Sequence, residues 1–395
     1  MKIKIFLFIL FLIIPCTVKG LDINSKNAIL YNLNNNEIIY EKNSDEVIKI
    51  ASLTKMMTTI VALENINNLD DKVMITSKML EGLIEKNASV AGFKVGDIVT
   101  YKDLLHGAML PSGADATQAL AISVSGNIDD YVLLMNNKAK QLKLTNTYFT
   151  NTTGLDEDNN HSTVKDVAIL LQYALSNDTF KKIFQTRYYE TTNGLKLISK
   201  IEENSLKYNI DTSIVKGAKT GMTYKAGLCL ASVATFNDID YLLVTAGADI
   251  NLKQPLNIID SLNIYDYYFK NYRKFNILTL DKNIITLDNK YSKEPFIIKS
   301  PIDYSLYMLK SDYEKLEYQY EGLNVVSIFD KNKLIGNYNI KLNGKIIKTI
   351  NIYGNDIEFS VYEFIKSYIY IFALVTISFI LLIFLKYRNI RLKKN

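Results

Sequence analysis

The stretch ASLTKMMT, residues 51–58, places a serine hydroxyl three positions before a lysine amine. Apolar residues recur from here to Leu63 with the spacing of a helix that packs against a sheet, so the stretch is predicted to begin a helix. Positions i and i+3 share one face of a helix, so the Lys55 amine can reach the Ser52 hydroxyl. The pair is a candidate nucleophile with its base, although this spacing alone also arises by chance on helix surfaces.

Segments on both sides of this helix predict a sheet with helices around it. Upstream, residues 28–33 and 37–41 are β-prone runs joined by an Asn-rich turn, which is typical of a hairpin. Downstream, the expected order is helices at 101–110, 115–124 and 129–142, a capped helix start at 162–166, strands at 214–221, 226–235 and 241–248, and a closing helix at 256–272. Residues 90–100 are expected to be strand-like. We therefore expect an α/β domain with an antiparallel sheet over residues 21–271.

The composition changes after this domain. Residues 272–355 are rich in Ile, Leu, Val, Tyr and Thr in short alternating runs, and Asn343-Gly344 separates two of them as in a two-residue hairpin. A small all-β domain is expected here, followed by a linker at 356–366.

Both ends of the chain predict export and anchoring. Lys2, Lys4 and the uncharged run 5–14 resemble a signal peptide at 1–20, with cleavage after Gly20 and a lipoprotein cysteine at Cys16 as an alternative. Cleavage would leave Cys229 as the single cysteine, so no intramolecular disulfide is expected.

Residues 367–385 carry no charge and are long enough to cross about 30 Å of hydrocarbon as a helix. The tail 386–395 is basic, which places it in the cytoplasm and the other domains outside, in a single-pass cell-membrane protein. The alternative, a buried core helix of a soluble domain, does not explain the cations of the tail.

The overall charge and the histidine and cysteine content argue against two classes of function, nucleic-acid binding and zinc binding. The net charge of the 395 residues is +5, and no basic block precedes the tail, so a nucleic-acid partner is not expected. With two histidines, far apart, and no cysteine cluster, a zinc site is not expected. His106 is expected to pack in a helix, His161 to lie at the surface, and Cys229 to fill a core position on a strand.

Three short motifs follow one another: SLTK at 52–55, SGA at 112–114 and KTG at 219–221. Each is weak alone. Their order and settings agree with the signature of serine acyl-enzymes that act on penicillin-like and D-alanyl substrates.

On these motifs the chain resembles the D-alanyl-D-alanine carboxypeptidases, the low-molecular-mass penicillin-binding proteins of serine peptidase family S11. The resemblance is carried by residues 51–58, LPSGADA at 110–116, NTTGL at 151–155, KTGMTYKAG at 219–227, and by 335–336 and 342–344 in the β domain. It implies a penicillin-binding/β-lactamase-like fold, a C-terminal membrane anchor and no cofactor. The implied partners are peptidoglycan stem peptides ending in D-Ala-D-Ala, with β-lactam antibiotics as covalent inhibitors.

The residue types suggest a role for each candidate. Ser52 would attack the carbonyl of the penultimate D-alanine, with Lys55 as general base if burial and nearby cations such as Lys219 lower its pKa. Ser112 would relay a proton to the departing D-alanine.

The third motif would bind the substrate. Lys219 and Thr220 would hold the terminal carboxylate, and Gly221 would let the substrate backbone approach. The resemblance implies an oxyanion hole made by the backbone N–H groups of Ser52 and Met222.

Three positions depart from the family pattern. Ala114 stands where the second motif usually has Asn, so a side-chain amide that would position Lys55 and the substrate is missing. Met222 stands where parts of the family have His. Lys253 and Gln254 stand where a downstream Arg often binds the carboxylate, and Lys253 is the candidate replacement.

Two other functions remain open. A β-lactamase shares the three motifs, but Glu157, Glu190, Glu202 and Glu203 lack the Asn four residues later that marks class A enzymes. A non-catalytic wall-binding scaffold is the other alternative, and Ala114 is its main support.

Overall fold

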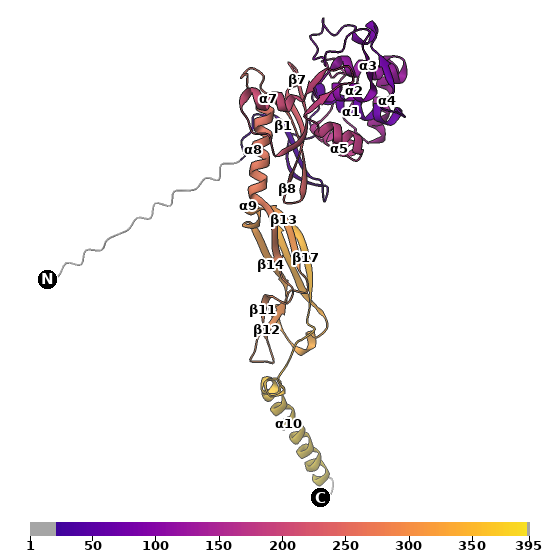
Figure 1. Ribbon diagram of the computed structural model, residues 1–395. Coiled ribbons are helices and arrows are strands. Elements are labelled where there is room, and N and C mark those ends of the chain that lie inside the picture. The colour runs from indigo at the N-terminus through magenta and orange to yellow at the C-terminus, as the bar shows by residue number, and fades with distance from the viewer. Residues whose placement is uncertain (1–20, 393–395) are drawn as a thin grey trace, which may run out of the picture. The chain divides into compact units, whose positions relative to one another are not determined.

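The computed structural model describes residues 21–392, and the predicted signal peptide at 1–20 lies outside them (Figure 1). The chain divides into two compact units between Tyr267 and Tyr268. The first unit is mixed α/β around an antiparallel sheet and the second is mostly β, followed by one apolar helix. This confirms the predicted fold class.

The sheet of the first unit has five strands in the order β2-β1-β9-β8-β7, and all neighbours are antiparallel. The predicted N-terminal hairpin and the three C-terminal strands are therefore parts of one sheet, with β7 at one edge. The strands are β1 Asn27–Asn32, β2 Glu37–Lys42, β7 Val215–Thr223, β8 Gly227–Phe236 and β9 Ile239–Ala248.

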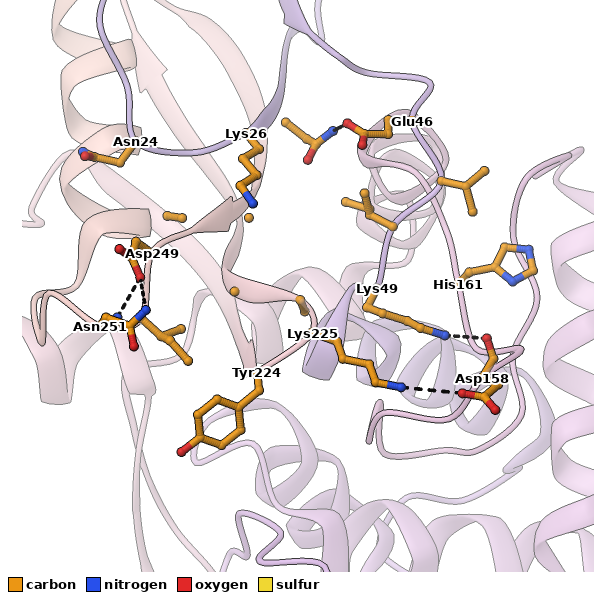
Figure 2. Close-up of a pocket in the computed structure, with 18 residues that line it drawn as sticks. Asn24, Lys26, Glu46, Lys49, Asp158, His161, Tyr224, Lys225, Asp249 and Asn251 are labelled. Atoms are coloured by element: carbon orange, nitrogen blue, oxygen red, sulfur yellow. Dashed lines mark hydrogen bonds and ion pairs between the residues drawn. The ribbon is translucent and has the colours of Figure 1, made fainter.

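An open hollow of about 920 Å³ lies where β1 begins and β9 ends (Figure 2). Lys49 lines this hollow, and its amine donates hydrogen bonds to the backbone carbonyls of Glu157, Asp158 and Asn160. The Lys225 amine lies 3.5 Å from the Asp158 carboxylate. These contacts join the loop at 157–160 to Lys49, just before the turn Ala51–Leu53, and to Lys225, between β7 and β8.

The helices follow the predicted order, with additional short elements. Thr100 and Thr163 accept the backbone N–H of Asp103 and Asp166, which caps α2 and α5. The helices are α1 Thr54–Asn65, α2 Tyr101–Met109, α3 Ala114–Ser125, α4 Ile128–Gln141, α5 Val164–Leu175, α6 Asp178–Gln185, α7 Lys200–Tyr208 and α8 Leu256–Asn271.

The short strand pairs β3 Lys72–Met74 with β4 Ile98–Thr100 and β5 Tyr188–Glu190 with β6 Lys196–Ile198 were not predicted as pairs. Of the expected strand-like segment 90–100, the last three residues form a strand. The carboxylate of Asp115 binds the backbone at 91–93 instead. A side chain from α3 thus takes the backbone hydrogen bonds that a strand partner would have taken.

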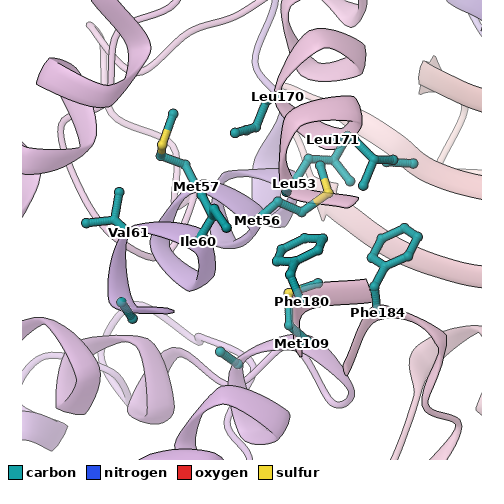
Figure 3. Packing of buried hydrophobic residues seen from close by; sticks show 14 of the residues in the cluster. Leu53, Met56, Met57, Ile60, Val61, Met109, Leu170, Leu171, Phe180 and Phe184 are labelled. Atoms are coloured by element: carbon teal, nitrogen blue, oxygen red, sulfur yellow. The ribbon is translucent and has the colours of Figure 1, made fainter. Parts of the chain in front are cut away.

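Helix α1 lies in the middle of the core (Figure 3). All its residues from Thr54 to Ala62 are buried, and its apolar side chains pack with Phe180 of α6 and Leu171 of α5. A helix enclosed in this way holds the residue at its first turn in one position. That residue is Ser52, in the short 3₁₀ turn Ala51–Leu53 that leads into α1.

The second unit has its own apolar core, which includes Val326, Ile340 and Ile357. Asn343 and Gly344 join β16 to β17 with φ values of 50° and 76°, as a two-residue hairpin requires. The elements are β10 Tyr272–Leu278, β11 Asn283–Asn289, β12 Phe296–Lys299, β13 Tyr304–Leu309, α9 Lys310–Tyr313, β14 Leu316–Gly322, β15 Val325–Val326, β16 Leu334–Leu342 and β17 Lys345–Tyr353.

The chain then enters helix α10, Val361–Leu392. Its segment Val361–Arg388 is long and apolar enough to cross a membrane, and its apolar side chains are exposed. The helix begins six residues before the charge-free run at 367–385, so the second half of the expected linker is helical.

Candidate active site

Ser52 is half-buried at the entrance to α1, and the residue before it has an unusual backbone. Ala51 has a φ of 47°, a region that residues with a Cβ rarely adopt. Such strain is kept where the surrounding structure enforces it, and it is common at functional sites. Here it turns the chain sharply at the candidate nucleophile.

Lys55 is 2% exposed, and its Nζ lies 2.8 Å from Ser52 Oγ. The amine also donates a hydrogen bond of 2.6 Å to the backbone carbonyl of Thr153. Burial lowers the pKa of Lys55 from 10.5 to about 7, and the Asp115 carboxylate opposes part of this shift. An amine with this pKa can accept a proton from Ser52 near neutral pH.

The Thr153 carbonyl is positioned by the loop at 151–155. Asn151 Oδ1 accepts hydrogen bonds from the backbone N–H groups of Thr153 and Gly154, and its Nδ2 donates to the Leu155 carbonyl. The Thr58 hydroxyl on α1 donates to the Thr152 carbonyl. This stretch carried part of the family resemblance, but its contact with Lys55 was not predicted. An Asn followed three residues later by Gly was the available signal for a tight loop.

Ser112 and Lys219 form a second hydroxyl–amine pair. Lys219 Nζ lies 2.8 Å from Ser112 Oγ and donates to the Thr220 carbonyl, also at 2.8 Å. Lys219 is 1% exposed, and burial, with the Lys55 and Lys200 charges, holds its pKa well below the ordinary value. Ser112 has a φ of 66°, so this hydroxyl too is on strained backbone.

Ala114 begins α3 and is 1% exposed, so its methyl group is enclosed by protein. The next residue, Asp115, accepts backbone N–H groups from Ala91, Gly92 and Phe93 at 2.8–3.1 Å. Asp115 was not among the residues predicted for the site. Its position in the first turn of a helix is compatible with ordinary capping, and the distant loop it binds cannot be seen in the sequence.

The KTG stretch lies on β7, the strand at the edge of the sheet, beside the turn that carries Ser52. A Cβ at Gly221 would lie 3.1 Å from the Ser52 backbone nitrogen and 3.1 Å from the Ile50 carbonyl oxygen. This close approach brings the backbone of β7 next to the nucleophile. Thr220 is half-buried here, and the side chain of Met222 is exposed.

A second open hollow, of about 780 Å³, is lined by Leu155, Met222 and Lys253 among others. Leu155 and Met222 follow Gly154 and Gly221 in the sequence, and both glycines approach the backbone nitrogen of Ser52. Tyr224 lines both this hollow and the one in Figure 2. Lys253 is exposed and lines the second hollow, whose lining does not include Ser52.

The two histidines and the cysteine lie apart from these pairs. His106 stacks on Tyr189 at 3.7 Å between ring centroids and its Nδ1 contacts the Lys102 carbonyl, so it is packed as expected. His161 pairs with Tyr148 in an isolated bridge and lines the hollow of Figure 2. Cys229 is buried on β8, and burial raises the pKa of its thiol to about 12.

A family model and two similar proteins all carry the same enzyme name. The sequence model of the family described as D-alanyl-D-alanine carboxypeptidase matches residues 15–250. D-alanyl-D-alanine carboxypeptidase DacA of Haemophilus influenzae is 30% identical over 341 residues, 84% of each chain. DacF of Bacillus subtilis, with the same enzyme name, is 29% identical over 69% of each chain.

The similar solved structures are a penicillin binding protein and a DD-transpeptidase. Penicillin binding protein 5 from Haemophilus influenzae matches with a TM-score of 0.59 and 27% identity, over 84% of this chain and 96% of that one. The Streptomyces K15 DD-transpeptidase matches with a TM-score of 0.57 and 30% identity, over 63% of this chain and 98% of that one.

Proposed function

The chain belongs to the D-alanyl-D-alanine carboxypeptidase family, serine peptidase family S11, and from this membership we propose that it removes the terminal D-alanine from peptidoglycan stem pentapeptides through a Ser52 acyl-enzyme. The observation that carries the mechanism is the geometry of two buried amines. Each lies 2.8 Å from a serine hydroxyl, Lys55 at Ser52 and Lys219 at Ser112.

Acylation begins when the neutral Lys55 amine takes the proton of Ser52 and Oγ attacks the carbonyl carbon of the penultimate D-alanine. The oxyanion that forms would accept hydrogen bonds from the backbone N–H groups of Ser52 and Met222. The C–N bond to the terminal D-alanine then breaks. The amine that leaves takes a proton from Lys55 through the Ser112 hydroxyl, and Ser52 is left as an ester.

Deacylation repeats these steps with water as the nucleophile. Lys55, neutral again, takes a proton from water, whose oxygen attacks the ester carbonyl. The ester C–O bond breaks, Ser52 recovers its proton, and the shortened peptide leaves with a new carboxylate. A β-lactam would acylate Ser52 in the same first step, and the bond that breaks would be the amide of its ring.

The substrate would lie along β7. Since β7 is an edge strand, an extended peptide can bind beside it through backbone hydrogen bonds. Thr220 and Lys219 would hold the terminal carboxylate, whose negative charge favours the charged form of the Lys219 amine. Lys253, exposed in the neighbouring hollow, would add a second positive charge farther from Ser52.

The backbone carbonyl of Thr153 can take the place of the missing side-chain amide at position 114 in orienting Lys55. Lys55 already contacts the Thr153 carbonyl at 2.6 Å and Ser52 at 2.8 Å, so its amine is oriented without an Asn side chain. This supports an active enzyme over the scaffold, whose main support was Ala114. Neither the scaffold nor a β-lactamase is favoured by the relatives found, which are named carboxypeptidases.

Replacement of Ala114 by Asn is therefore expected to raise kcat/KM for D-alanine release by less than about tenfold, because Lys55 already has its acceptor. The measurement is a comparison of the two proteins on one pentapeptide. A gain of several hundredfold would show that the missing amide limits the enzyme and that the Thr153 carbonyl does not replace it.

The proposed location follows from α10. This helix would cross the cell membrane once, with the basic tail in the cytoplasm and the catalytic domain outside, next to the peptidoglycan. Its apolar, exposed surface supports the anchor. The orientation rests on the cations that follow residue 385 in the sequence.

The proposed activity is tested by incubating the full-length protein in detergent with a stem pentapeptide that ends in D-Ala-D-Ala. The matched control is the same peptide ending in D-Ala-L-Ala. Free alanine is expected from the first and not from the second. Equal release from both would reject a D-alanyl-D-alanine specificity, and release from neither would reject the activity.

A further inference from the structure

The start of α10 is fixed to the β domain by backbone and side-chain contacts. Ser360 donates its backbone N–H to the Tyr291 carbonyl at 2.7 Å, and Asn289 Nδ2 donates to the Glu358 carbonyl at 2.7 Å. About two turns into the helix, the hydroxyls of Tyr291 and Tyr368 are 2.7 Å apart. The helix therefore leaves the domain in a defined direction.

Aromatic rings fill the junction. The Tyr291 side chain is 1% exposed, and its ring lies 4.9 Å from that of Phe364. Phe329 and Phe359 each lie 6.5 Å from Phe364. Two segments of the β domain, at Tyr291 and Phe329, and the residue Phe359 just before the helix thus meet the first two turns of α10 in one aromatic cluster.

The outer rings of this cluster are exposed, unlike Tyr291. Phe329 is 60% exposed and Phe359 is 44% exposed. Exposure of large apolar rings to water is unfavourable, and aromatic residues are enriched at membrane–water interfaces. We call Tyr291, Phe329 and Phe359 the aromatic end of the β domain.

The distance along α10 from Phe364 to the charge-free run gives the depth of the aromatic end in the bilayer. The charge-free run begins at Ser367, and Phe364 precedes it by less than one helical turn, a rise of roughly 5 Å. A headgroup layer on one side of a bilayer is of similar thickness, roughly 5–8 Å. If 367–385 fills the hydrocarbon, the rings that contact Phe364 are at headgroup depth.

We propose that the aromatic end of the β domain inserts into the lipid headgroup layer, so that the membrane is a binding partner of the domain as well as of the helix. The inference rests on the proposed anchor. Because α10 is docked through Tyr291 and Tyr368, insertion of these rings fixes the tilt of the β domain on the bilayer. The partner is the phospholipid interface, recognised by exposed aromatic rings.

The chain contains no tryptophan, so a single introduced tryptophan reports its own position without background. The test uses full-length protein in liposomes, with phospholipids brominated on the acyl chains near the headgroup as contact quenchers. Phe329→Trp probes the aromatic end, and Phe379→Trp probes the exposed surface of α10. Tyr307→Trp is the matched control, since Tyr307 is 38% exposed and its ring contacts Tyr272, next to α8.

Phe329→Trp is expected to lose about half of its fluorescence in brominated liposomes, as an interfacial aromatic residue should, while Tyr307→Trp keeps its intensity. Phe379→Trp reports on the anchor separately. Quenching at position 379 without quenching at 329 would overturn the inference and leave the anchor intact. Absence of quenching at both positions would overturn the anchor and the inference together.

Discussion

Replacing Lys55 by Met is expected to lower kcat/KM for D-alanine release by roughly 10⁴-fold or more, because removing one member of a catalytic unit costs most of what the unit supplies. The Met side chain has similar length and fills the same buried space. It leaves Ser52 without the amine that lies 2.8 Å from its hydroxyl. The measurement is steady-state release of D-alanine from a pentapeptide.

The matched control is Lys216→Met on β7, an exposed lysine three residues from Lys219. It should leave the rate within a few-fold of the unchanged protein. The melting temperature of the Lys55 variant should change little, since loss of a hydrogen bond to Thr153 is offset by removal of a buried amine. A Lys55→Met enzyme that retained a tenth of the activity would show that another group is the base.

The same amine predicts the dependence of acylation on pH. As the proposed base, Lys55 would act when it is neutral, and burial lowers its pKa to about 7. The rate of acylation should therefore be level above this pH and fall roughly tenfold per unit well below it. An exposed lysine would place that fall several units higher. Acylation by a chromogenic β-lactam, followed across pH 5–9, measures this profile.

Replacing Gly154 by Ala is expected to disrupt the site, although it changes none of the side chains proposed to act in catalysis. A Cβ at this position would lie 2.0 Å from the Ala51 carbonyl oxygen, which no Cβ can approach so closely. Either residue 154 or residue 51 must move. The first shifts the Thr153 carbonyl that holds Lys55, and the second shifts Ser52 itself. We expect a loss of at least 100-fold in kcat/KM and roughly 3 kcal/mol or more of stability.

The variant Gly194→Ala is the control that separates the effect of the Gly154 clash from the cost of a left-handed backbone. Gly194 has a φ of 84°, close to the 79° of Gly154, but a Cβ there would meet nothing within 4 Å. Its substitution should cost about 1–2 kcal/mol through left-handed backbone alone and leave activity unchanged. Equal losses of stability in the two variants, with activity kept in both, would show that the contact between Gly154 and Ala51 is unimportant.

The parts of the fold that local patterns control were predictable from the sequence. Alternating runs around Asn-rich and Asn-Gly turns predicted both hairpins, and the three motifs predicted a carboxypeptidase of family S11. Between residues 72 and 100 the prediction was partly right: the segment 90–100 was expected to be strand-like and its last three residues form β4, whereas β3 was not predicted. Residues 91–93 are not a strand, because the carboxylate of Asp115, from a distant helix, binds their backbone.

The site was predictable to the level of residue type. A hydroxyl and an amine at i and i+3 predict contact, and the structure brings Ser52 and Lys55 together. The amine that approaches Ser112 comes from a strand far along the chain, so the resemblance was needed to find it. The Thr153 carbonyl could not be found, since every residue has one. This carbonyl contacts Lys55 because the loop held by Asn151 lies beside α1.

Ser52 is proposed to be the residue that the substrate acylates, and mass spectrometry of the protein after exposure to benzylpenicillin, with peptide mapping, tests this proposal. We expect one added penicillin molecule, carried by the peptide that contains Ser52, and no adduct on the Ser52→Ala variant. An adduct on another residue, an equal adduct on Ser52→Ala, or no adduct on the unchanged protein would contradict it.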